Sequence, residues 1–234
     1  MLSRLLRIWS PDLLRPIIRL LMRARISPNQ LTLAGLVLAI IAGVLAAIGS
    51  LSLAALVLLL SGFLDALDGE LARQSDSQTP FGAFLDSISD HYGDFAVYLG
   101  IAWQMQRSGE HATVLLTLVA MFGSLVGSQI RSRAGMMGLD TKDVGIFTRA
   151  ERIIVFVLGL LTGFLMPAIA LLAFANNLSA LQRLRHIAFP RGAKEARRAY
   201  SPATVTTGPR VPIPASMSPP MMPRCSRNVV SSRI

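Results

Sequence analysis

The chain has 234 residues, of which 52% are hydrophobic and 15% charged, with a formal net charge of +10 and one cysteine, Cys225. Soluble domains carry about 25% charged residues, so this composition excludes an ordinary soluble domain and indicates a polytopic membrane protein. A lone cysteine excludes a disulfide framework or a zinc pattern, and the positive charge favours a membrane surface or an anionic substrate over nucleic acid.

Leucine, isoleucine and arginine alternate at helical spacing over residues 1–25. The arginines interrupt any apolar run of the kind that a signal peptide needs. Ser10, Pro11 and Asp12 are typical of a helix start. The pattern predicts an amphipathic juxtamembrane helix on the membrane surface. A basic stretch that only orients the protein is the open alternative.

Six apolar blocks follow, at residues 31–48, 51–71, 81–105, 112–130, 153–163 and 166–181. About 20 residues span the hydrocarbon core of a bilayer. We therefore predict an all-α polytopic fold with six transmembrane helices in one domain, residues 26–189. The last two blocks are short and meet near Pro167, so a re-entrant pair remains an alternative.

Basic residues recur on every second connection between the blocks, which predicts that both termini are cytoplasmic. Residues 190–234 are rich in proline, serine and arginine and show no period. This composition predicts a disordered tail. The tail is either a polybasic lipid-binding segment or a dispensable extension.

Two pairs of aspartates flank the connection between the second and third blocks. Asp65 and Asp68 are three residues apart, and Asp86 and Asp90 are four apart, so each pair shares one helix face. Thr79, followed by a proline, favours the start of the third helix. Two antiparallel helices with a short link would bring the four carboxylates together at the cytoplasmic membrane surface.

Four anions at a membrane interface repel one another unless a cation is shared among them. Carboxylate oxygens select Mg²⁺ or Mn²⁺, and two such ions are a recurring solution for phosphoryl chemistry. Gly69 and Gly82 permit a close approach, and Arg73 can pair with a phosphate. A solvated acidic loop is the alternative, and Glu70 and Asp76 fit it, so neither is assigned to the site.

The aspartates belong to a longer motif of eight positions at fixed gaps. The motif reads Asp65-x₂-Asp68-Gly69-x₂-Ala72-Arg73-x₈-Gly82-x₃-Asp86-x₃-Asp90. It matches the signature of the CDP-alcohol phosphotransferases, and the chain resembles this family over about residues 25–185. The lead-in "ISPNQLTLAGL" resembles the Pro-Asn-x-x-Thr element that precedes the first span in the family.

The resemblance implies transfer of a phosphatidyl group from a CDP-linked lipid to an alcohol, with release of CMP. It also implies that Asp65, Asp68, Asp86 and Asp90 hold two metal ions and that Asp90 is the general base for the acceptor hydroxyl. Homodimer formation is a further implication. The residues expected to contact the CDP-lipid are Pro28, Asn29, Thr32, Gly69, Arg73 and Thr79; Asn29 and Thr32 are also consistent with a mere helix start.

Two segments, "SQIRSRAGMMGL" and "FTRAERIIVFVLG", resemble the branch of the family that makes phosphatidylinositol phosphate or its archaeal analogue. In that branch three basic residues bind the acceptor phosphate, which here would be Arg131, Arg152 and Arg183. Arg131 stands where a lysine is expected, and His91 where an arginine is expected. The alternative is that these arginines bind no phosphate and only follow the positive-inside rule. Arg149 is equally basic, so the sequence does not separate it from the three arginines assigned to the acceptor phosphate.

The sequence thus predicts a membrane transferase that uses CDP-diacylglycerol and a polyol phosphate, most simply inositol phosphate. Glycerol 3-phosphate is the first alternative acceptor. A membrane cation transporter is the alternative of another class, but it needs carboxylates near the membrane midplane, where we expect none. The intact motif argues against a catalytically inactive scaffold.

Overall fold

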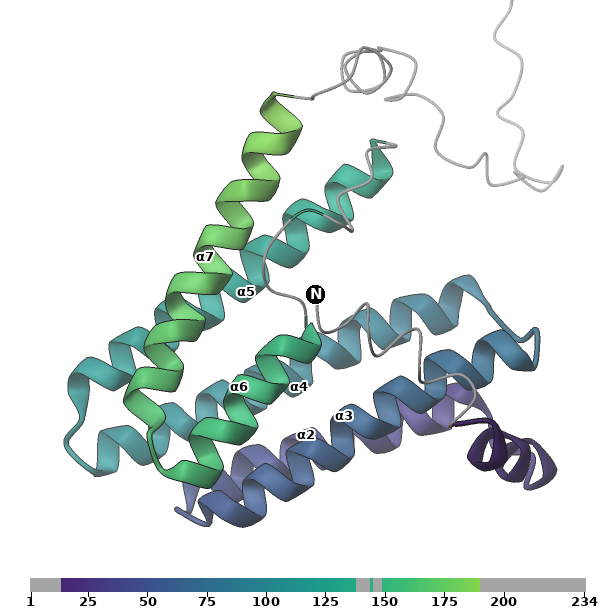
Figure 1. Cartoon of the computed structure of the whole chain (residues 1–234), viewed down its shortest axis with the longest axis horizontal. Coiled ribbons are helices and arrows are strands. Elements are labelled where there is room, and N and C mark those ends of the chain that lie inside the picture. The colour runs from purple at the N-terminus through teal and green to yellow at the C-terminus, as the bar shows by residue number, and fades with distance from the viewer. Residues whose placement is uncertain (1–13, 138–143, 145–148, 190–234) are drawn as a thin grey trace, which may run out of the picture.

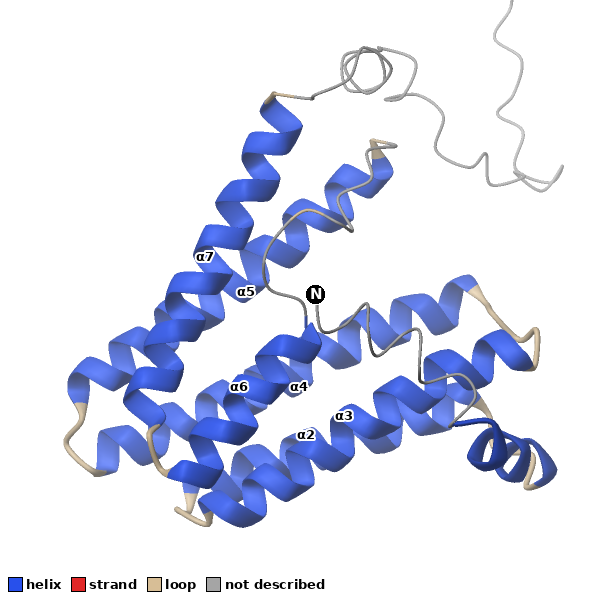
Figure 2. Ribbon diagram, viewed as in Figure 1, coloured by secondary structure: helices blue, strands red, loops and turns tan. Residues whose placement is uncertain are grey.

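The computed structural model describes residues 14–137, 144 and 149–189, and all regular elements in these ranges are helices (Figure 2). A helical segment over residues 14–23 comes first. Six longer helices follow: α2 (Pro28–Ala47), α3 (Leu51–Gln74), α4 (Pro80–Arg107), α5 (His111–Met136), α6 (Arg149–Thr162) and α7 (Leu165–Ala188). Each of the six predicted apolar blocks is confirmed as a helix. The predicted helix start at residues 10–12 and the predicted tail, residues 190–234, lie outside the described residues.

Four of these helices, α2, α3, α5 and α7, are long and apolar enough to cross a membrane. Helix α4 has 28 residues but carries several aspartates along its length. Helix α6 has 14 residues, which at 1.5 Å per residue cover about 21 Å of an apolar layer about 30 Å thick. An all-helical membrane architecture is therefore supported. That α4 and α6 also cross the membrane, which would give six spans, stays a prediction.

The helices form two groups that meet at α4 and α6 (Figure 1). Helix α2 packs against α3 and α4, α5 packs against α7 and α4, and α6 packs between α3 and α7. Where α2 crosses α4, a Cβ atom added to Gly100 would lie only 2.0 Å from the carbonyl oxygen of Gly43. The two backbones are thus in direct contact, which only glycine permits here.

Within the described part of the chain, the segment over residues 14–23 has a buried apolar side and exposed arginines, and the amphipathic juxtamembrane helix over residues 1–25 stays a prediction. Ile18 is fully buried and belongs to an apolar cluster with Leu31 and Leu71, whereas Arg19 and Arg23 are exposed. Its apolar face therefore packs on the start of α2 and the end of α3, rather than only on lipid. This contact holds the segment next to the helix ends that carry the aspartates.

Local capping explains where α2 and α4 begin. Ser27 accepts a hydrogen bond from the backbone N–H of Gln30, and the Gln30 side chain bonds back to the Ser27 N–H. Thr79 accepts a hydrogen bond from the N–H of Gly82 over 3.0 Å, as the sequence predicted. Only residues 75–79 separate α3 from α4, so the two aspartate pairs are held at neighbouring helix ends.

Candidate functional site

The structure brings three of the four predicted metal ligands into one tight group. One carboxylate oxygen each from Asp65, Asp68 and Asp86 lies within 4.8 Å of the other two. Asp68 is the most enclosed, with 5% of its surface exposed. Oxygen atoms at these separations fit the ligand shell of a hard divalent cation, so the residues present suit the metal that the sequence implies.

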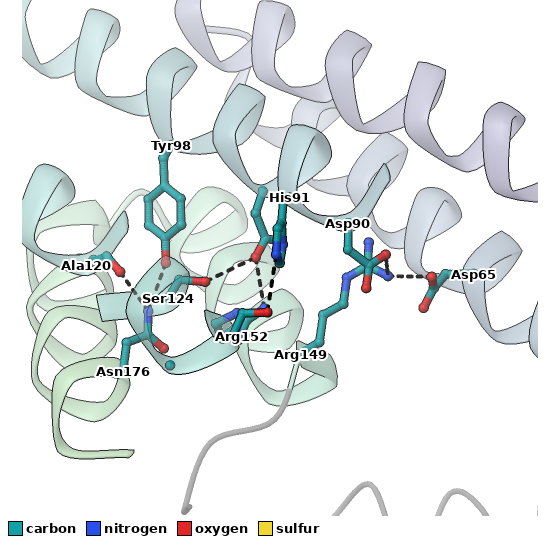
Figure 3. Close-up of polar contacts among 12 residues, drawn as sticks. Asp65, Asp90, His91, Tyr98, Ala120, Ser124, Arg149, Arg152 and Asn176 are labelled. Atoms are coloured by element: carbon teal, nitrogen blue, oxygen red, sulfur yellow. Dashed lines mark hydrogen bonds and ion pairs between the residues drawn. The ribbon is translucent and has the colours of Figure 1, made fainter. Parts of the chain in front are cut away.

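Asp90 stands next to this group rather than inside it. Its carboxylate forms an ion pair with Arg149, the first residue of α6, and the same guanidinium donates to Asp65 (Figure 3). Only 20% of the Arg149 side chain is exposed. Its positive charge therefore offsets two of the four aspartates.

Sequence reasoning did not assign Arg149 to the site. The only signal for it was its position at the start of a helix in a basic stretch. That signal did not distinguish it from the other arginines that were predicted to be cytoplasmic.

Thr32 was predicted to contact the CDP-lipid, and the structure places it against a metal ligand. Its hydroxyl lies 2.5 Å from Asp68 Oδ2 and 3.1 Å from the carbonyl oxygen of Pro28. A hydroxyl group has one hydrogen to donate, and the shorter contact with a carboxylate is the stronger of the two. Thr32 therefore orients Asp68.

Two other predicted nucleotide contacts converge at the start of α4. A Cβ atom added to Gly82 would lie 3.1 Å from Thr79 Oγ1 and 3.2 Å from Asn29 Oδ1. The absence of a side chain at Gly82 thus lets the first turn of α2 approach the first turn of α4. Pro28 lies in that first turn of α2.

Gly69 and Arg73 lie one helical turn apart near the end of α3, and a Cβ atom on Gly69 would be 3.7 Å from Arg73 Nη1. Arg73 pairs with Glu70 over 2.5 Å, and Glu70 also accepts a hydrogen bond from Gln74 over 2.9 Å. Our interpretation of Glu70 as an ordinary surface group was wrong, because it is buried and holds Arg73. Asp76 is exposed in the following turn, as expected.

The three predicted acceptor arginines form a basic cluster. Arg131 and Arg152 are close enough to act electrostatically on each other, and both act on Arg183. Arg183 is buried and donates to the carbonyl oxygens of Gly127 over 3.1 Å and Val144 over 2.9 Å. Part of its hydrogen-bonding capacity is thus committed to the backbone.

Arg152 forms an ion pair with Asp94 over 2.9 Å, and each side chain is 15% exposed. Asp94 lies near the middle of α4, so the expectation that no acidic residue occupies the middle of a predicted span was wrong. His91, on the same helix, is partly buried, with its Nε2 3.2 Å from Ser128 Oγ.

A small pocket adjoins the aspartates, and its polar lining includes Asp65, Asp68, Asp90 and Arg149. Ser89 also lines it, and its buried Oγ has no hydrogen-bond partner among the described residues. The pocket therefore offers carboxylates, a guanidinium and a hydroxyl on one surface. Such a surface can hold a metal-bound phosphate and activate a hydroxyl group.

Comparison with known proteins is consistent across sequence and structure. The family described as CDP-alcohol phosphatidyltransferase matches residues 25–184. The archaetidylinositol phosphate synthase of Methanothermobacter thermautotrophicus is 35% identical over an alignment of 184 residues. The match covers 74% of this chain and 91% of that protein.

Two crystal structures of phosphatidylinositol phosphate synthase from Mycobacterium tuberculosis share the fold. The structure with CDP-DAG bound has a TM-score of 0.67 and 31% identity, and covers 73% of this chain and 90% of its own. The complex with manganese and citrate has a TM-score of 0.68 and 28% identity, and covers 82% of this chain and 92% of its own.

Proposed function

The chain belongs to the CDP-alcohol phosphatidyltransferase family, and we propose that it transfers the phosphatidyl group of CDP-diacylglycerol to an inositol phosphate. In this reaction the acceptor hydroxyl forms a bond to the lipid phosphorus. The bond from that phosphorus to the bridging oxygen breaks, and CMP leaves. The relatives named above support this choice of donor and acceptor.

The observation that carries the proposal is the group formed by Asp65, Asp68 and Asp86. These carboxylates, with Asp90, would hold Mg²⁺ or Mn²⁺, and four carboxylates suffice for two ions. Bound divalent ions would supply charge neutralisation at the diphosphate and at the CMP leaving group. The manganese complex of the Mycobacterium tuberculosis enzyme supports a divalent metal in this fold.

Asp90 is our candidate for the general base. It stands beside the three-aspartate group and not within it, and Arg149 pairs with one oxygen of its carboxylate, so we propose that the other oxygen accepts a proton from the acceptor hydroxyl. A base needs to lie within about 3 Å of that hydroxyl. Asp90 also lines the pocket at the aspartates, which is where the two substrates would meet.

The donor would lie between the starts of α2 and α4 and the end of α3. Asn29 and Thr79 would contact the nucleotide across Gly82, and Arg73 would pair with a phosphate. Pro28 and Gly69 would allow the close approach, and Thr32 would act through Asp68 in addition to any contact with the nucleotide.

The acceptor phosphate would lie at the cluster of Arg131, Arg152 and Arg183. A dianionic phosphate between three cationic side chains is a favourable arrangement. Because this cluster recognises the phosphate and not the polyol, glycerol 3-phosphate remains the alternative acceptor. A cation carrier has less support, since the mid-helix carboxylate of Asp94 is already paired with Arg152.

We propose that this site lies at the cytoplasmic face of the membrane, with both termini on that side. The reason is that the connections on the side of the site carry most of the arginines, and basic residues are enriched on the cytoplasmic side of membrane proteins. The acyl chains of the donor would remain in the bilayer while the nucleotide reaches water.

The test is a CMP-release assay on the purified protein in proteoliposomes with CDP-diacylglycerol. The acceptors are inositol phosphate, inositol, glycerol 3-phosphate and serine. We expect Mg²⁺- or Mn²⁺-dependent release with inositol phosphate, and none with D65A. Release with glycerol 3-phosphate alone would reassign the acceptor. If none of the four acceptors gives metal-dependent release of CMP, the proposal is overturned.

A further inference from the structure

Asp94 is an acidic residue for which the motif provides no role. It lies four residues after Asp90 in α4, so both carboxylates project from the same helix face, one turn apart. Its side chain is 15% exposed. A carboxylate in the middle of a helix bundle is costly unless it is paired, so its partners indicate why it is there.

Among the described residues, Asp94 has hydrogen-bond partners on two other helices. Arg152 of α6 donates to its Oδ2 through Nη2 over 2.9 Å, and Ser124 of α5 approaches the same oxygen at 3.4 Å. The ion pair is therefore the main contact, and Ser124 adds a weak one.

The contact uses only one edge of the Arg152 guanidinium. The described residues offer no partner for the buried Nε of Arg152. An unpaired buried N–H is unfavourable, and a planar guanidinium can bind two anions from different edges. Arg152 is thus held by a carboxylate on one side and retains capacity for a second anion.

The position of Arg152 is unfavourable without that carboxylate. Arg131 and Arg183 lie close enough to repel it electrostatically. Without Asp94, this repulsion and the desolvation of the guanidinium would both favour other rotamers that reach water. The ion pair keeps Arg152 inside the basic cluster when no phosphate is bound.

The same contact sets a distance. Asp90 and Asp94 are four residues apart, which at 1.5 Å per residue is about 6 Å along the axis of α4. Tying Arg152 to Asp94 therefore fixes the guanidinium relative to Asp90, the proposed base. A polyol phosphate presents its hydroxyl and its phosphate at a similarly fixed separation, so both ends can be engaged at once.

We propose that Asp94 is a positioning residue that holds the Arg152 guanidinium in place for the acceptor phosphate, at a set distance from Asp90. The inference rests on the proposed function, since it assigns Asp94 to the acceptor side of that reaction. It predicts that loss of the Asp94 charge affects the acceptor and not the CDP-lipid.

The test compares D94N with wild type in proteoliposomes, with CMP release measured against both substrates. We expect the KM for inositol phosphate to rise about tenfold or more, with kcat and the KM for CDP-diacylglycerol within about twofold of wild type. D94E, which keeps the charge, should recover part of the loss. An unchanged acceptor KM in D94N, or equal rises in both KM values, would overturn the proposal.

A double-mutant cycle shows whether Asp94 acts through Arg152. In an R152Q background, D94N should change the acceptor KM by less than about twofold, because the group it positions is already absent. Fully additive effects would contradict the proposal. If D94N alone does not fold, D94S, which also removes the charge, takes its place in the cycle, and an unchanged acceptor KM in D94S then counts against the proposal.

Y98F is the matched control for a purely structural effect. Tyr98 lies one turn beyond Asp94 in α4 and accepts a buried hydrogen bond from Asn176 over 3.0 Å. Its loss should lower the melting temperature without altering the acceptor KM. If wild type fails to release CMP with every polyol phosphate tested, the proposed function has failed. If wild type is active and D94N keeps the acceptor KM of wild type, only the inference about Asp94 has failed.

Discussion

Thr32 donates a hydrogen bond of 2.5 Å to Asp68, so a hydroxyl at the start of α2 orients a carboxylate near the end of α3. Both side chains are buried. Hydrogen bonds of this kind fix the direction in which a metal-binding carboxylate presents its other oxygen. The Pro-Asn-x-x-Thr element thereby contacts one of the proposed metal ligands, in addition to its proposed contact with the nucleotide.

The first prediction follows from this contact. T32V keeps the shape of the side chain and removes the hydroxyl, so we expect the Mg²⁺ concentration for half-maximal activity to rise about tenfold. T32S retains the hydroxyl and should stay close to wild type. A higher KM for CDP-diacylglycerol in T32V with unchanged metal dependence would instead make Thr32 only a nucleotide contact.

Arg149 offsets the charge of Asp65 and Asp90, and a bound divalent metal would do the same. We therefore predict that R149Q is destabilised mainly in the absence of metal. Its melting temperature should fall by about 5 °C in EDTA and by much less in saturating Mg²⁺. R133Q, which removes an exposed arginine from α5, is the control. Equal losses of R149Q stability in both buffers would contradict this role.

Asp90 is predicted to accept the proton of the acceptor hydroxyl. D90N should lower kcat for CMP release by about 10²–10⁴-fold, while binding of CDP-diacylglycerol to the protein in vesicles is largely retained. D76N changes an exposed carboxylate in the turn after α3 and should behave as wild type. Near-normal turnover of D90N would refute its role as the base.

Gly82 separates Asn29 from Thr79, and a Cβ atom there would lie 3.2 Å and 3.1 Å from their side-chain oxygens. Since both side chains would have to move, G82A should raise the KM for CDP-diacylglycerol by about threefold to tenfold. In G135A the added Cβ atom meets no atom within 4 Å, so this variant is the matched control. If G82A and G135A have the same KM, the nucleotide does not lie at this helix start.

The local features of the fold could be predicted because their causes are local. Apolar runs long enough for a helix predicted all six elements, and Thr79 before a proline predicted the start of α4. The spacing of Asp65 from Asp68 and of Asp86 from Asp90 predicted that each pair shares one helix face. A short connection between the two helices then sufficed to bring three of these four carboxylates together, those of Asp65, Asp68 and Asp86.

The remaining contacts of the site join residues far apart in the chain, and no spacing rule reaches them. The pairing of Arg149 with Asp65 and Asp90 depends on how α6 packs against α3. The pairing of Asp94 with Arg152 likewise links α4 to α6. In the sequence alone, each of these arginines is one of many basic residues in the connections and at the helix ends.

The sequence by itself thus determined the class of protein, the helices and the aspartate motif, because hydrophobicity and helical periodicity act over a few neighbouring residues. Only the tertiary structure decided which cation meets which carboxylate. That choice depends on the direction of each helix axis and on burial, which makes an unpaired charge costly and so selects Arg149 for Asp90 and Arg152 for Asp94.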